Sequence, residues 1–166
     1  MNMEQYKYMS INSVGRLIEF LHTKINKQDT YCHVAMCTDR NFNIFDKTTS
    51  VGINSSRKRF KNDNITTHAE IQAMNNLKYK LSRHRIRKIK VNLIVLRFLK
   101  NGCLSCSAPC YHCTTEISKN KCIEINNLYY STDNGIAKMK FDDWMKNESK
   151  CISKGWKHAI TNRCKK

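Results

Sequence analysis

The spacing of hydrophobic positions predicts a helix followed by two strands in the first third of the chain. Residues 13–25 carry apolar side chains at the three-to-four spacing of an amphipathic helix, with Ser13 as a candidate N-cap. Residues 31–38 alternate and are rich in small apolar side chains, which predicts a strand ending in a turn at 39–41. A second strand is expected over 43–52, followed by a polar, basic loop over 55–64.

Two more helices and three more strands are predicted in the rest of the chain. A helix opens at Thr66 and Thr67 and continues through Leu77 or beyond. Residues 91–99 are apolar on both faces, as buried strands of parallel sheets tend to be. A third helix is expected from Cys110 to about Lys119, and strands over 127–131 and 136–141 are separated by an Asp-Asn-Gly turn.

The order of these elements predicts an α/β fold. Helices that lie between consecutive strands imply crossover connections, which place helices against a mostly parallel or mixed sheet in three layers. The chain has 166 residues, enough for one domain and too few for two domains or a (β/α)₈ barrel. We expect a single domain over 1–145 and a basic tail over 146–166, with no internal repeat and no linker.

The charge of the chain points to an anionic partner. Thirty Lys and Arg residues face thirteen Asp and Glu residues, a formal net charge of +17. Nucleic acid, a nucleotide phosphate or an acidic membrane surface would suit that charge. Basic residues gather in 57–61, in 78–90 and in the tail. Lys, Asn and Ile are also the residues that AT-rich coding favours, so coding bias is an alternative source of part of the excess.

Whether the nine cysteines form disulfides or bind metal depends on the redox state of the compartment. The N-terminus shows no basic segment followed by an apolar run, and no apolar stretch approaches the ~20 residues needed to span a bilayer. We therefore expect an intracellular, cytoplasmic protein with reduced thiols and no membrane partner. Clustered cysteines in such a protein indicate metal ligands more often than disulfides.

Two short segments carry the candidate chemistry. His68 and Glu70 stand two residues apart, and Pro109 precedes Cys110 and Cys113. Cysteines three residues apart share one face of a helix, and the positive end of the helix favours their thiolate forms. One His and two Cys leave a fourth position for water, which is the catalytic pattern for Zn²⁺.

Together the two segments match the H-x-E…P-C-x-x-C pattern of zinc deaminases. Over roughly residues 31–141 the chain therefore resembles the cytidine/deoxycytidylate deaminase superfamily, which includes the tRNA adenosine deaminases. The resemblance implies a three-layer α/β/α sandwich with a five-stranded mixed sheet, and a catalytic domain over 1–145. It also implies a nucleotide or nucleic acid substrate, and it is compatible with a homo-oligomer.

The resemblance assigns roles to individual residues. It implies that His68, Cys110 and Cys113 bind Zn²⁺ and that Glu70 shuttles protons. Asn54 occupies the place of the superfamily's sugar-contacting Asn. The backbone of Ala69 and of Ser107, Ala108 and Pro109 would hold the edge of the base. The expected reaction is hydrolytic deamination of cytosine, with adenosine in RNA as the alternative.

Other interpretations of the same residues stay open at this point. Thr67 and Glu70 also form a capping-box pattern, in which Glu70 would only bond the Thr67 backbone. Cys103 and Cys106 extend the cysteine cluster, so a four-thiolate zinc site or an iron–sulfur motif made of Cys106, Cys110 and Cys113 are alternatives. A catalytically silent, zinc-stabilised nucleic-acid-binding module is a further possibility.

Overall fold

The computed structural model describes residues 19, 31–43, 46, 49–59, 63–147 and 150–152. Its strands are β1 (Tyr31–Thr38), β2 (Ser50–Ile53), β3 (Ser55–Arg59), β4 (Asp63–Thr67), β5 (Ile89–Leu99), β6 (Leu104–Ser105), β7 (Ile123–Thr132) and β8 (Gly135–Lys140). Its helices are α2 (Ala69–Arg83), α3 (Tyr111–Ser118) and α4 (Phe141–Lys146). None of the helices in these ranges is long and apolar enough to cross a membrane.

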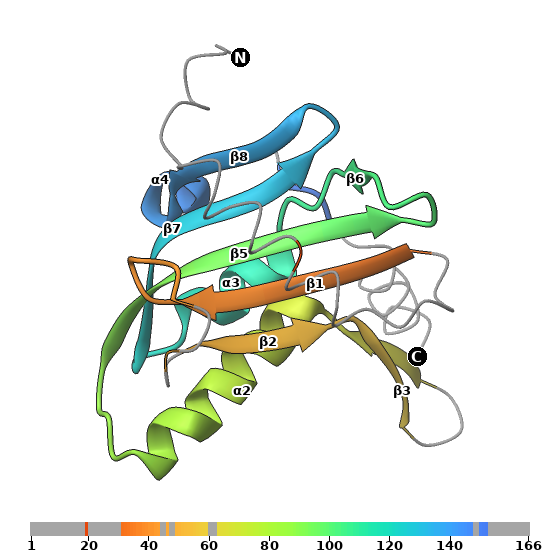
Figure 1. Ribbon diagram of the computed structural model, residues 1–166. Helices are drawn as coiled ribbons and strands as arrows, with labels where there is room; N and C mark the ends of the chain where they lie inside the picture. The colour runs from red at the N-terminus through yellow and green to blue at the C-terminus, as the bar shows by residue number, and fades with distance from the viewer. Residues whose placement is uncertain are drawn as a thin grey trace.

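One mixed sheet organises the described part of the chain. Its strands run in the order β2-β1-β5-β7-β8, and the short β6 pairs with the end of β5 (Figure 1). β5 and β7 are parallel, because α3 carries the chain over the sheet between them, whereas the other neighbours are antiparallel. β1 pairs with β5 along its whole length, from Tyr31 opposite Leu99 to Thr38 opposite Asn92.

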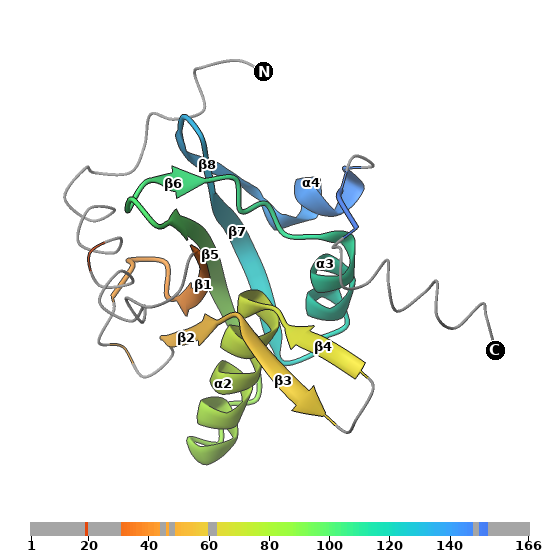
Figure 2. The same cartoon turned by 90° about the vertical axis from the view of Figure 1, so that its right-hand side faces the viewer.

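The three helices cover the same face of this sheet (Figure 2). Alternate residues of β1, β5 and β7 pack against α2, α3 and α4, among them Ala35, Val95 and Leu128. The intervening residues, such as Met36 and Ile94, form a second apolar cluster on the opposite face. The helix predicted over 13–25 lies outside the described residues except for Glu19.

Helix α2 is joined to the open edge of the sheet by three polar side chains. Gln72 Oε1 accepts the Ile53 N–H at 2.7 Å, Asn76 Nδ2 donates to the Val51 carbonyl at 2.8 Å, and Lys80 Nζ donates to the Thr49 carbonyl at 2.6 Å. These three residues are four apart, so they lie in one row along the helix. They satisfy backbone groups of the edge strand β2, and of Thr49 just before it, that would otherwise be exposed.

The predicted fold class is confirmed: helices flank a mixed sheet, with six strands where five were expected. The sixth, β6, is only two residues long and has no alternating pattern to reveal it. The strand expected over 43–52 is shorter, since β2 covers only Ser50–Ile53. The polar loop expected over 55–64 is wrong: this segment contributes to the hairpin β3–β4, which the absence of apolar alternation concealed.

Helices α2 and α3 begin later than predicted. α2 starts at Ala69 rather than at Thr66, because Thr66 and Thr67 pair with β3, and it continues to Arg83. α3 starts at Tyr111, with Cys110 as its N-cap, so Pro109 precedes the cap instead of opening the helix. The later starts place His68 and Cys110 at the N-caps of the two helices.

Replacing Gly52 with Ala should disturb the contact between β2 and α2. A Cβ at this position would overlap the helix backbone at the Ala69 carbonyl oxygen and the Ala73 nitrogen. Because these are backbone atoms, α2 must move, and we expect a loss of about 3 kcal/mol in the free energy of unfolding. Urea denaturation measures this loss.

Gly102→Ala is the matched control for that substitution. Gly102 has φ +79°, yet a Cβ there meets no atom within 4 Å. It should cost only the strain of the left-handed backbone, about 1 kcal/mol. An equal loss in both variants would contradict the close approach of α2 to Gly52.

Candidate metal centre and active site

His68 is held where strand β4 passes into helix α2. It is the N-cap of α2, with extended backbone angles of φ −69° and ψ 148°, and its side chain makes no capping hydrogen bond. The imidazole is therefore not used to cap its own helix. Since α2 is fixed across β1 and β2, the position of this N-cap relative to the sheet is also fixed.

The two cysteines occupy the first turn of α3. Cys110 is the N-cap and Cys113 lies three residues later, so both sulfurs lie near the positive end of the helix dipole. Thr114 ties this turn together: its Oγ1 donates to the Cys110 carbonyl at 2.9 Å and accepts from Trp144 Nε1 of α4 at 3.1 Å. α4 therefore supports the cysteine-bearing turn from behind.

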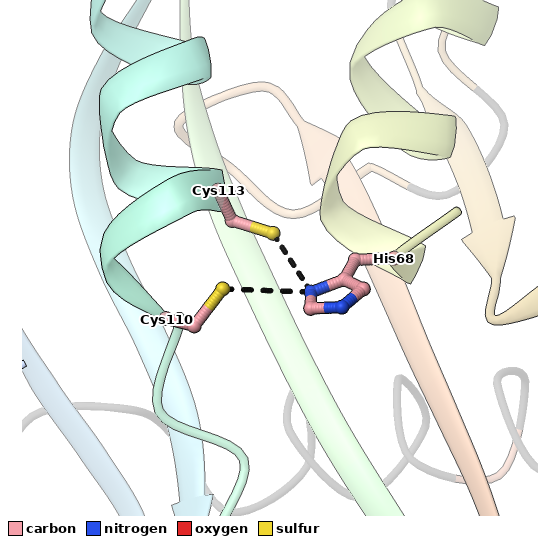
Figure 3. Close-up of side chains that lie close together, drawn as sticks. All are labelled: His68, Cys110 and Cys113. Carbon is pink, nitrogen blue, oxygen red and sulfur yellow. Dashed lines mark hydrogen bonds between the residues drawn. The ribbon is translucent and has the colours of Figure 1, made fainter. Parts of the chain in front are cut away.

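The three side chains converge from the two helices on one point (Figure 3). His68 Nδ1 lies 3.1 Å from Cys113 Sγ and 3.5 Å from Cys110 Sγ. Their ligand atoms all lie within 4.8 Å of one another. Both cysteines are buried, at 5% and 0% exposure, and His68 is half-buried. This is the one cluster of three or more His, Cys, Asp or Glu side chains with metal-site geometry among the described residues.

Hydrogen bonds inside the cluster shift the pKa values of its three side chains. Hydrogen bonding from the Cys113 thiol and from His68 lowers the pKa of Cys110 to about 3, against the opposing effect of burial. Its hydrogen bond with Cys110 raises the pKa of His68. The hydrogen bond between Cys113 and Cys110, followed by burial, raises the pKa of Cys113. Two sulfurs and an imidazole whose ligand atoms lie this close together form a donor set that fits a thiophilic divalent metal ion.

Glu70 lies beside this cluster and outside its ligand set. Its side chain is only 4% exposed, and burial is the main cause that raises its pKa. The carboxyl hydrogen-bonds with the Cys113 side chain and interacts with the charge of His68. The capping-box interpretation is wrong, because the N-cap of α2 is His68 and Thr67 lies in β4.

Asn54, which is distant in the sequence from α2, caps the N-terminus of this helix. Its Oδ1 accepts the Ala69 N–H, the first of the helix, at 2.7 Å. Its own backbone N–H donates to the His33 carbonyl at 3.0 Å. The Ala69 N–H is thus already bonded in this structure, although the sequence analysis expected it to hold the edge of the base. A sugar contact by Asn54 stays a prediction.

Ser107, Ala108 and Pro109 lead directly into Cys110. The Ser107 N–H donates to the Ser131 carbonyl at 2.9 Å, and its hydroxyl donates to the Val95 carbonyl at 2.7 Å. Ser107 and Pro109 are buried and Ala108 is half-buried. Ser107 therefore joins the cysteine loop to the sheet. Substrate contacts of this segment remain a prediction.

The remaining cysteine alternatives do not fit the geometry. Cys103 and Cys106 are exposed, and neither belongs to the cluster of His68, Cys110 and Cys113. An iron–sulfur site would need Cys106 beside Cys110 and Cys113, and a four-thiolate zinc site would need both exposed cysteines. The structure supports the His-Cys-Cys set instead.

The sequence analysis gave no part in the site to His33, which feels the charge of His68, or to Arg97. They lie opposite each other in the β1–β5 register, and strand alternation puts His33 on the helix-covered face with Ala35 and Cys37. Burial, then the charges of Arg97 and His68, lowers the pKa of His33 to about 4. The available signal was a His and an Arg at strand positions where the alternating pattern predicts a buried apolar residue.

Comparison with known proteins finds likeness in structure only. No protein-family model matches the chain, and no curated protein matches its sequence. The fold is similar to crystal structures of cytidine deaminase from Mycobacterium leprae and Mycobacterium tuberculosis. The first has 10% identity and a TM-score of 0.44, covering 80% of this chain and 93% of that one. The second has 12% identity and a TM-score of 0.44, covering 82% and 94%. These scores are low, so the geometry of the site itself carries the functional argument.

Removing one ligand should abolish metal binding. We expect the unaltered chain to bind about one metal ion, and Cys113→Ser, which replaces a buried sulfur donor with a hydroxyl, to lose most of it. Elemental analysis of purified protein measures the content. Cys103→Ser, which removes an exposed thiol outside the cluster, should leave it unchanged. Equal metal content in both variants would contradict the assigned ligand set.

His33 should make the stability of the fold depend on pH. Its pKa is about 4 in the folded state and 6.5 in the reference state, so between these values the unfolded chain binds a proton that the folded chain does not. The stabilisation is complete above pH 6.5 and is lost as the pH falls toward 4. Denaturant titration across this window should show a smaller loss for His33→Asn.

The matched control for that prediction is His84→Asn, which changes an exposed histidine at the end of α2. It should keep the pH profile of the unaltered chain. Both variants retain the three cluster residues, so metal release contributes equally to each. Identical profiles for all three proteins would contradict the effect ascribed to His33.

Proposed function

We propose that the chain is a zinc-dependent hydrolase that deaminates a nucleobase, with cytosine in a nucleotide, nucleoside or polynucleotide as the first choice. The observation that carries this proposal is the position of Glu70. A buried carboxyl group with a raised pKa lies against a His-Cys-Cys cluster without belonging to it. A purely structural metal site needs no such group, and four protein ligands usually complete it.

Zinc fits the three ligands best among common ions. Thiolate and imidazole donors favour it, and three protein ligands are the arrangement of catalytic zinc sites. When bound, zinc supplies Lewis-acid activation of water near neutral pH. His68, Cys110 and Cys113 would hold the ion at the junction of α2 and α3, where the first turns of both helices meet.

Glu70 would move the protons of the reaction. Its carboxylate accepts a proton from the attacking water, and the resulting acid donates to N3 of cytosine. The new hydroxyl at C4 then gives its proton, through Glu70, to the exocyclic amino group, which leaves as ammonia while a carbonyl forms at C4. Water and cytosine thus become uracil and ammonia. Burial suits Glu70 to taking up a proton, because it raises the pKa of the carboxyl.

Asn54, Ala69 and the segment 107–109 are the proposed substrate contacts. Asn54 directly follows β2 and is exposed; its amide nitrogen would donate to a sugar hydroxyl while its oxygen caps α2. Ala69 directly follows His68, and Ala108 lies two residues before Cys110, so the backbone of both would be available to a bound base. Adenosine in RNA is the alternative substrate, by the same chemistry at C6.

Glu70→Gln tests the proposal most directly. The substitution keeps the size of the side chain and removes its ability to accept a proton. We expect the rate of ammonia release to fall by about 10²–10⁴-fold while the metal content stays unchanged. Glu116→Gln, at an exposed position of α3, is the matched control and should retain full activity.

The assay should offer cytidine, dCMP, dCTP, adenosine, guanine and single-stranded DNA and RNA in parallel. Turnover of a cytosine substrate supports the first choice, and turnover of adenosine in RNA alone supports the alternative. If zinc-loaded protein turns over none of them and Glu70→Gln changes nothing, the cluster is a structural zinc site and the proposed function is wrong.

A further inference from the structure

The hairpin β3–β4 begins and ends at residues of the candidate site. Asn54 immediately precedes β3, and His68 immediately follows β4. The strands pair from Ser55 opposite Thr67 to Arg59 opposite Asp63, and they form a two-stranded sheet separate from the main one. The bond between the Ala69 N–H and Asn54 Oδ1 closes the base of the hairpin. In both views it extends away from the main sheet beside the beginning of α2 (Figures 1 and 2).

Strand β3 concentrates positive charge at this place. Arg57, Lys58 and Arg59 are consecutive, and Asp63 is the one acidic residue of either strand. Asp63 lies opposite Arg59 in the register, whereas Arg57 and Lys58 lie opposite the uncharged Ile65 and Asn64. With a rise of about 3.3 Å per residue, Arg57 is about 10 Å and Arg59 about 17 Å along the strand from Asn54.

The other basic segment lies at the far end of α2. In a helix of fifteen residues the last residue lies about 21 Å from the first. Arg83 and Arg87 therefore lie well away from His68, and Lys88 and Lys90 form ion pairs with Glu124. Proximity to the site singles out the hairpin among the described basic segments.

We infer that the hairpin β3–β4 binds the sugar-phosphate backbone of a single-stranded nucleic acid and guides the strand to the site. The phosphate of a free nucleotide lies one sugar away from its base, whereas the basic positions of β3 extend farther from Asn54, where neighbouring nucleotides of a strand would lie. A base must leave the stack to reach a buried centre, which favours single strands over duplex. Only the guiding step depends on the proposed function; the binding does not.

The test measures binding in the Glu70→Gln background, so that no turnover interferes. The probes are fluorescein-labelled single-stranded DNA and RNA oligonucleotides of the same sequence, and the DNA duplex, followed by anisotropy over a range of salt concentrations. Replacing Arg57 and Lys58 with Thr keeps strand propensity and removes two charges. We expect about a tenfold loss of affinity for single strands, and a salt slope smaller by about 1.4.

Two further variants make the result specific. Lys78→Gln with Arg87→Gln removes the same charge from exposed positions far from the hairpin, and it should change affinity by less than about twofold. Arg57→Lys with Lys58→Arg keeps both charges and should bind as the parent does, which separates loss of charge from loss of folding. Comparison of the affinities for the DNA and RNA oligonucleotides identifies which kind of single strand the hairpin binds.

Several results would overturn the inference. They are no binding of single strands by the parent, equal losses in the hairpin and far-end variants, and equal affinity for duplex and single strand. Turnover of free cytidine or dCMP together with no oligonucleotide binding would refute the inference and leave the proposed function standing. Hairpin-dependent binding without turnover of any substrate would refute the proposed function and support the binding surface.

Discussion

The contact between α2 and the edge strand β2 determines where the chemistry of this molecule can be. An open strand edge exposes backbone groups, and here a row of Gln72, Asn76 and Lys80 satisfies three of them. Such bonds fix the position of the helix along the strand as well as its distance from it. Gly52 permits the close approach, since any larger residue would meet the backbone of α2. Because this contact extends along the helix, it holds the N-terminus of α2 in place, and His68 with it.

The second half of the site is held by different means. Cys110 and Cys113 are positioned by a loop that Ser107 joins to β5 and β7, and by the packing of α4 behind Thr114. The site therefore lies where two independently anchored helix N-termini meet. Both ends direct a positive dipole toward the same small volume, which favours thiolates and any anionic group placed there. This explains how two sulfurs can be buried side by side.

Sequence patterns predicted those parts of the fold whose burial follows a simple period. β1 was predicted with its observed limits, and β5 to within two residues, because alternation and continuous apolarity reflect burial directly. The hairpin β3–β4 has neither pattern, and the pairing of Arg57 with Ile65 depends on chain geometry that no local signal records. The His-Cys-Cys set followed from a motif, whereas the cap provided by Asn54 and the place of His33 opposite Arg97 depend on tertiary contacts.

The two halves of the site are far apart along the chain. His68 and Cys110 are separated by 42 positions, and α2, β5 and β6 lie between them. A metal ion bound to both would act as a cross-link that closes this long loop. The entropy of loop closure in the unfolded chain grows with the logarithm of loop length, so such a link restricts the unfolded ensemble strongly. Ligand binding and folding would then share one free energy, and loss of the ion would loosen the path from α2 to α3 along with the site.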